Sequence, residues 1–135
     1  MTNDMFVDSS ALVAVILNEP EGTEFNKKIE LAKRKWICGL NVFEVALALI
    51  RVKDDSYEIL LDITETYLER HGFQCVEIDA KIARAAVDAF AIFGKGRHKA
   101  KLNMGDCFSY ACAKKLRLPL LFKGNDFIHT DIQIA

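Results

Sequence analysis

The segment Leu102–Phe122, LNMGDCFSYACAKKLRLPLLF, has the pattern of a helix start, a helix and a buried strand. Asn103 is a good N-cap residue, and Asp106 follows where a carboxylate complements the positive end of a helix dipole. Pro119 ends the helix, and the apolar run 120–122 is typical of a strand that is covered on both faces. The segment therefore predicts a helix that begins beside the ends of buried parallel strands.

Asp106 has two interpretations at this position. An acid in the first turn of a helix is often only a complement to the helix dipole. Open α/β sheets, however, place their ligand sites in the crevice outside the carboxyl ends of the strands, which is where this helix is expected to start. The functional interpretation depends on whether other acids reach the same edge.

The rest of the chain alternates between strand-like and helix-like segments. The predicted strands are residues 5–7, 36–40, 73–78, 120–122 and a last strand at 131–134. The predicted helices are residues 11–17, 22–35, 41–50, 57–70, 79–93 and the helix that carries Asp106. This alternation predicts one α/β domain over residues 1–135, with a small parallel sheet flanked by helices on both faces.

Three further acids are expected at the edge where Asp106 lies. Asp8 follows the first strand, Glu44 opens the helix after the second, and Asp126 follows the strand 120–122. Each has a local explanation, because Asp8 can cap a helix, Glu44 can form a capping box with Asn41, and Asp126 can cap a short turn. Four acids on one rim are harder to explain in this way, and together they predict a site.

Composition limits the class of protein. The chain has 135 residues, 27% of them charged, and a net charge of −1. This charge balance argues against a strongly basic protein that coats nucleic acid without sequence preference. No apolar run is long enough for a membrane span, and the N-terminus lacks a signal pattern. The four cysteines show no ligand spacing, so we expect reduced core residues of a cytoplasmic protein.

A basic loop, 94–101, leads directly into the helix that carries Asp106. Its sequence, GKGRHKAK, includes Lys95, Arg97 and Lys99. A solvated loop and a phosphate-binding loop are both compatible with this composition. Its place just before Asp106 favours phosphate binding by Lys95, Arg97 and Lys99.

Four motifs resemble those of the PIN domain, and most of all its VapC toxin subtype. They are FVDSSAL with Asp8, NVFEVA with Glu44, NMGDCF with Asp106, and PLLFKGNDF with Asp126. The resemblance implies a magnesium- or manganese-dependent endoribonuclease that cuts a structured RNA such as tRNA or rRNA. It also implies inhibition by a VapB-type antitoxin and a homodimer, which is usual in that family. By the same resemblance Asp8, Glu44 and Asp106 match the first three acids of the family site, and Ser9 or Ser10 matches its hydroxyl residue.

The residues agree with the implied metal. Crowded carboxylates destabilise one another unless a hard cation neutralises them, and oxygen ligands without His or Cys favour Mg²⁺ or Mn²⁺. We expect Asp8 and Asp106 to bind the cation. Many PIN domains carry an acid where this chain has Gly124, so the fourth role is absent or falls to Asn125 or Asp126, of which we favour Asp126 as a supporting group.

Two other functions stay open at this point. The first is a catalytically inactive PIN-like interaction module, in which the acids serve only as helix caps. The second is a metal-dependent phosphotransfer protein, although Asp8 is followed by two serines and not by the Asp-x-Asp that such phosphatases need.

Overall fold

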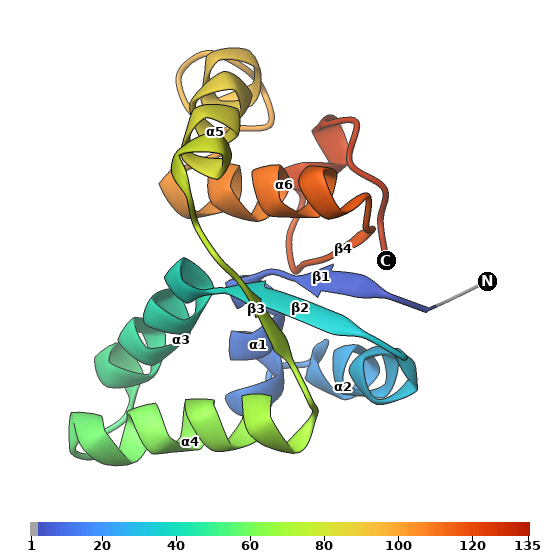
Figure 1. Cartoon of the computed structure of the whole chain (residues 1–135). Helices are drawn as coiled ribbons and strands as arrows, with labels where there is room; N and C mark the ends of the chain where they lie inside the picture. Colours follow the sequence, from blue (N-terminus) through green and yellow to red (C-terminus); the bar gives the residue numbers. More distant parts are fainter. Residues whose placement is uncertain (1–2) are drawn as a thin grey trace.

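A computed structural model describes residues 3–135, in which a parallel four-stranded sheet separates two layers of helices (Figure 1). The strands are β1 (Met5–Val7), β2 (Lys35–Cys38), β3 (Gln74–Val76) and β4 (Leu120–Leu121). The helices are α1 (Ser9–Ile16), α2 (Gly22–Leu31), α3 (Gly39–Val52), α4 (Tyr57–Arg70), α5 (Ala80–Phe93), α6 (Met104–Leu116) and the short 3-10 helix η1 (Phe127–His129).

The strand order, β3-β2-β1-β4, places a topological switch point at β1. The chain runs from β1 through β2 to β3 in one direction and then returns to place β4 on the other side of β1. Phe6 of β1 accordingly lies opposite Trp36 of β2 and also opposite Leu120 of β4. Ligands of open α/β sheets bind outside the carboxyl ends of the strands at such a point, and Asp8 is the residue that follows β1 there.

Two apolar cores lie on the two faces of the sheet. Helices α5 and α6 cover one face, and α1 to α4 cover the other (Figure 1). The side chains of β1 alternate between them, because Phe6 belongs to the α5–α6 core whereas Met5 and Val7 belong to the opposite one. A small parallel sheet with helices on both faces, as predicted, is confirmed.

Some predicted boundaries are wrong. Helix α3 begins at Gly39 with Cys38 as its N-cap, so Asn41 lies inside the helix and does not cap it together with Glu44. Residues 131–134 form no strand, and Ile134 makes only an isolated bridge to Leu120. Leu120 also donates its backbone N–H to Gln133 O (2.8 Å) and accepts from the backbone N–H of Ala135 (3.0 Å), and Tyr110 and Lys114 of α6 both donate to Asp131.

The cysteines depart from the prediction at one position. Cys38, Cys107 and Cys112 are buried, but Cys75 is exposed, because β3 is an edge strand with few neighbours. All four are free thiols. No helix between residues 3 and 135 has the length and apolar character that crossing a membrane requires.

Candidate functional site

A pocket of about 360 Å³ opens where β1 and β4 end and where α1 and α6 begin. It is lined by Asp8, Ser9, Ser10, Val13, Glu19, Glu44, Leu47, Ala48, Arg51, Asn103, Asp106 and Lys123. Three of the four predicted acids therefore share one pocket, together with both predicted serines. The fourth, Asp126, does not line it, but its charge contributes to the raised pKa of Asp106.

Asp8 is a helix cap and a pocket residue at the same time. Its Oδ2 accepts hydrogen bonds from the backbone N–H of Ser10 (3.0 Å) and from Ser10 Oγ (2.6 Å), which starts α1. Its Oδ1 accepts from Ser109 Oγ at 2.5 Å. Ser10 Oγ in turn accepts from the backbone N–H of Lys123, which ties the end of β4 to the first acid.

Glu44 is held at the pocket by a hydrogen bond from a serine and by its close approach to Gly105, which has no side chain to exclude it. Ser9 Oγ donates to Glu44 Oε1 at 3.0 Å. A Cβ atom on Gly105 would lie 2.6 Å from the carboxyl carbon of Glu44, so only glycine lets this carboxylate rest against the first turn of α6. Burial and then the charge of Asp8 raise the pKa of Glu44. Because α3 starts at Gly39, a capping role does not explain this acid.

Asp106 is the acid most affected by its neighbours. It forms a capping box with Asn103, in which Asn103 Oδ1 accepts from Asp106 N at 2.9 Å and Asp106 Oδ2 accepts from Asn103 N at 3.1 Å. Burial and the charge of Asp8, with smaller contributions from Asp126 and Glu44, nevertheless raise the pKa of Asp106 to about 7. Burial and the neighbouring carboxylates thus together favour a proton, or another cation, at Asp106.

The segment after β4 carries the candidates for a fourth acid. Asp126 is exposed and accepts no capping hydrogen bond from η1, so the capping explanation for this residue is wrong. Gly124 has φ 101°, a conformation that favours glycine and that an aspartate would adopt only with strain. Asn125 is exposed and does not line the pocket.

Arg51 and Lys123 also line the pocket, although neither was among the predicted site residues. Lys123 Nζ lies 2.9 Å from Glu19 and 3.5 Å from Glu21, so these two acids balance its charge. Arg51 lies two turns along α3 from Glu44, on the same side of the helix. That seven-residue spacing is the signal that could have identified it.

The basic loop lies outside the pocket lining and leads into α6 (Figure 1). Lys95, Arg97 and Lys99 are exposed, whereas the intervening His98 packs edge-on against Phe93 with 5.2 Å between ring centroids. Ala100 is fully buried. The loop is therefore anchored from inside, with its cations directed to solvent.

The donor set fits a hard divalent cation. Asp8, Glu44 and Asp106 offer only oxygen, which Mg²⁺ and Mn²⁺ prefer. Within residues 3–135 no group of three His, Cys, Asp or Glu side chains is close enough to form a closed metal cluster. Magnesium commonly binds through one or two carboxylates and keeps several waters, so Asp8 and Asp106 meet its requirements without a closed cluster.

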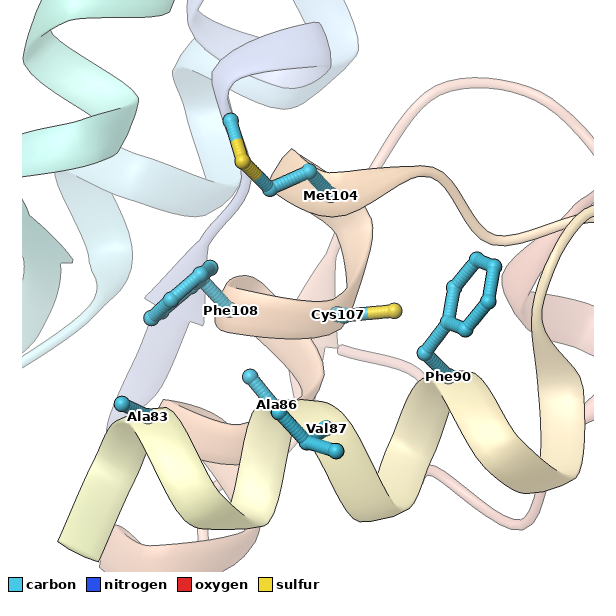
Figure 2. A pocket seen from close by; sticks show the side chains of 7 residues that line it. All are labelled: Ala83, Ala86, Val87, Phe90, Met104, Cys107 and Phe108. Atoms are coloured by element: carbon cyan, nitrogen blue, oxygen red, sulfur yellow. The ribbon is translucent and has the colours of Figure 1, made fainter. Parts of the chain in front are cut away.

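A second hollow, of about 310 Å³, is apolar and lies between α5 and α6 (Figure 2). Its lining consists of Ala83, Ala86, Val87, Phe90, Met104, Cys107 and Phe108. Val87 and Met104 are 64% and 66% exposed, which is high for large apolar side chains. Its lining side chains offer no oxygen for a hard cation, and the hollow suits contact with another apolar surface.

Comparisons with known proteins agree with this geometry. Residues 5–133 match the PIN domain family. Ribonuclease VapC30 of Mycobacterium tuberculosis is 41% identical over 128 residues, which cover 95% of each chain. Among solved structures, VapC20 of Mycobacterium tuberculosis, a toxin that cleaves the sarcin–ricin loop, superposes with a TM-score of 0.79 at 13% identity, over 97% of this chain and 98% of that one. A toxin–antitoxin complex from Klebsiella pneumoniae gives a TM-score of 0.73 at 17% identity, over 97% and 96% of the two chains.

Proposed function

The chain belongs to the PIN domain family, among its VapC ribonucleases, and from that premise we propose that it is a metal-dependent endoribonuclease toxin acting on a structured RNA in the cytoplasm. The observation that carries this proposal is the pocket shared by Asp8, Glu44 and Asp106 at the switch point of the sheet. Glu44 has no capping role, which speaks against an inactive module whose acids survive only as caps. The free cysteines are consistent with a reducing compartment.

Asp8 and Asp106 would bind Mg²⁺ or Mn²⁺, and the cation would supply positive charge at the scissile phosphate and a more acidic water. The raised pKa of Asp106 gives it a strong preference for a neutralising cation. The raised pKa of Glu44 makes it a better base than an ordinary carboxylate, and Ser9 fixes its orientation. We therefore assign the proton of the attacking water to Glu44 and leave Asp126 to support Asp106 from outside the pocket.

Basic residues would hold the RNA on both sides of the cut. Lys95, Arg97 and Lys99 lie on the loop that leads into α6 and would contact flanking phosphates. Arg51 lies in the pocket itself and would contact a phosphate closer to the cut. A pocket of bare carboxylates repels RNA, so the reaction requires such contacts.

We also propose an antitoxin partner that covers the pocket. Phe43 and Ile50 on α3 are 62% and 46% exposed, and Leu47 on the same side of that helix lines the pocket. A VapB-like segment that packs on these apolar side chains would reach the acids, where an arginine would pair with the carboxylates. The likeness to a toxin–antitoxin complex supports such a partner.

The experiment that tests the function is a cleavage assay on tRNA and rRNA fragments with Mg²⁺, with Mn²⁺ and with excess EDTA. We expect cleavage only with a cation and none from Asp106→Asn, because the cation site is then incomplete. Asp62→Asn, which changes an exposed acid of α4 outside the pocket, is the matched control and should cleave like wild type. Cleavage undiminished in EDTA would exclude the mechanism.

A cell assay tests the partner. Expression of the chain alone should arrest growth, and co-expression of the antitoxin encoded beside it should restore growth. Normal growth with the protein confirmed present would contradict a toxin function.

A further inference from the structure

We infer that Ser109, held in place by Asn41, is a positioning residue that makes Asp8 bind its cation through Oδ1. The inference rests on the proposed function, because it concerns the cation that Asp8 would hold. It assigns a role to two buried residues that belong neither to the acids nor to the pocket lining.

The observation is a chain of hydrogen bonds that ends at Asp8. Cys38 donates to Asn41 Oδ1 from its backbone N–H (3.1 Å) and from its Sγ (3.0 Å). Asn41 Nδ2 donates to Ser109 Oγ at 2.9 Å, and Ser109 Oγ donates to Asp8 Oδ1 at 2.5 Å. Asn41 and Ser109 are 0% exposed and Asp8 is 2% exposed, so water does not compete for these groups.

A backbone group fixes which partner donates and which accepts in each of these hydrogen bonds. The N–H of Cys38 can only donate, so the Asn41 oxygen must face it and the Asn41 NH₂ must face Ser109. The Ser109 oxygen is then an acceptor on that side, and its own hydrogen is directed to Asp8. The donor at Oδ1 of Asp8 therefore cannot turn away without leaving buried polar groups unpaired, which is unfavourable.

Counting lone pairs shows what this arrangement leaves for a cation. An ionised carboxylate offers about two acceptor directions on each oxygen. On Asp8 Oδ2, the N–H and the hydroxyl of Ser10 occupy both directions. On Oδ1, Ser109 occupies one direction and leaves one open. A cation at Asp8 is thus directed to Oδ1, and Ser109 determines where the open lone pair points.

A purely structural role would not require this series of hydrogen bonds from Asn41 through Ser109 to Asp8. The oxygen of Asn41 alone completes the capping box of α3 with Cys38. The NH₂ group of Asn41 and the hydroxyl of Ser109 add nothing to that cap, and α6 carries alanine at the neighbouring buried positions Ala111 and Ala113. Two buried polar groups that serve no cap but end on the first acid of the pocket are explained by the orientation of that acid.

The test compares Ser109→Ala with wild type and with Thr64→Val. Thr64 is the matched control, because it is also a fully buried hydroxyl, bonded to Leu60 O within α4 and outside the pocket lining. The first readout is the Kd for Mn²⁺ alone, measured from the electron paramagnetic resonance signal of free Mn²⁺. We expect Ser109→Ala to raise this Kd roughly ten- to a hundredfold, the usual effect of removing a partner behind a metal ligand. Thr64→Val should bind Mn²⁺ like wild type.

A second readout separates positioning from damage to the fold. In the RNA cleavage assay Ser109→Ala should lower kcat at limiting Mn²⁺, leave KM for RNA unchanged, and recover kcat as Mn²⁺ is raised. Ser109→Cys keeps a similar volume but has a weaker donor, so its Kd for Mn²⁺ and its kcat should lie between those of Ser109→Ala and wild type. If Ser109→Ala does not fold, the cysteine variant serves as the test.

The outcomes distinguish the two proposals. Wild-type protein that binds no Mn²⁺ would overturn this inference and the proposed function together. Wild-type protein that binds Mn²⁺ and cleaves RNA, with equal Mn²⁺ affinity in the serine, alanine and cysteine forms, would overturn the role of Ser109 alone. An equal loss of affinity in Thr64→Val would also overturn it, because the effect would then follow from any lost buried hydroxyl.

Discussion

Gly105 and Glu44 meet where α6 begins, and the carboxylate occupies the space that a side chain at position 105 would fill. We expect Gly105→Ala to fold with a stability within about 1 kcal/mol of wild type, since alanine favours a helix. The new methyl group should displace the flexible Glu44 side chain and break its bond to Ser9, lowering the cleavage rate on the order of a hundredfold. Urea unfolding and cleavage kinetics measure the two effects.

Gly39 provides the control for that substitution. A Cβ atom there meets nothing within 4 Å, so Gly39→Ala should keep both stability and cleavage. If Gly105→Ala cleaves as well as Gly39→Ala, the close approach to Glu44 does not matter for the reaction.

Asp106 should make the stability of the metal-free protein depend on pH. Its pKa is about 7 in the folded protein against an ordinary value of 3.8, so the folded state holds a proton that the unfolded state has lost. Stability should therefore fall as pH rises between about pH 4 and 7. Asp106→Asn should flatten that fall, and its metal-free form should be the more stable one near pH 8.

The measurement is the free energy of unfolding in urea with a chelator present, at about pH 5 and pH 8. Addition of Mg²⁺ at the higher pH should stabilise wild type more than Asp106→Asn. Equal slopes for the two proteins would show that Asp106 does not carry the pH dependence.

At the scale of single residues, the acids of the pocket could be predicted from the sequence, but the hydrogen bonds that hold them could not. Asp8 follows β1 and Asp106 lies in the first turn of α6, both of which are visible in the sequence, whereas Glu44 lies in the second turn of α3 and not at its start. Ser109 lies in a buried part of α6 and Asn41 inside α3, and their bond joins positions that are far apart in the chain. A polar residue in an apolar helix was the available signal, because buried polar groups need partners.

At the scale of elements, α6 joins the acidic pocket to the basic loop before it. Replacing Lys95, Arg97 and Lys99 by alanine should weaken RNA binding and lower its salt slope by about 2, the value for three contacts to single-stranded phosphates. The Kd for Mn²⁺ should stay unchanged, because these side chains lie outside the pocket lining. Fluorescence anisotropy over a range of salt concentrations measures the slope.

The control for the loop has the same change in charge at another place. Lys27, Lys33 and Arg34 are exposed in or after α2, near the amino end of β2 and thus at the opposite edge of the sheet. Their triple alanine variant should bind RNA with the wild-type salt slope. Equal salt slopes for wild type and both triple variants would mean that the basic loop is only a solvated surface and does not contact RNA.

Element types followed from the sequence better than element boundaries. The start of α6 was predicted because Asn103 and Asp106 form a complete capping signal. The start of α3 was not, because its N-cap is a cysteine whose role depends on the buried Asn41. The predicted strand at 131–134 is reduced to one bridge between Ile134 and Leu120, because β4 itself has only two residues with which to pair.

At the scale of the whole molecule, the apolar hollow between α5 and α6 bears on assembly (Figure 2). We expect a homodimer in which a second copy of the chain covers this hollow, and we expect Val87→Glu to shift it to a monomer, since burying an unpaired charge is costly. Ile59→Glu, at a 53% exposed position of α4, is the control and should remain a dimer. Sedimentation velocity measures both.

The outcome also separates two uses of the surface. Loss of antitoxin binding in Val87→Glu, with the dimer intact, would mean that the hollow receives the antitoxin. A wild-type monomer at all concentrations would contradict the homodimer.

The switch point in the sheet has a consequence for synthesis. β1 leaves the ribosome early, but its partner on one side, β4, is made more than a hundred residues later, so that Phe6 waits for Leu120. Contacts of such long sequence separation form late in folding. A nascent chain that has not yet released β4 has Asp8 and Glu44 but neither Asp106 on a docked α6 nor the Lys123 bond to Ser10. The pocket is therefore complete only after most of the chain has left the ribosome, so a chain that is still being made lacks the assembled site.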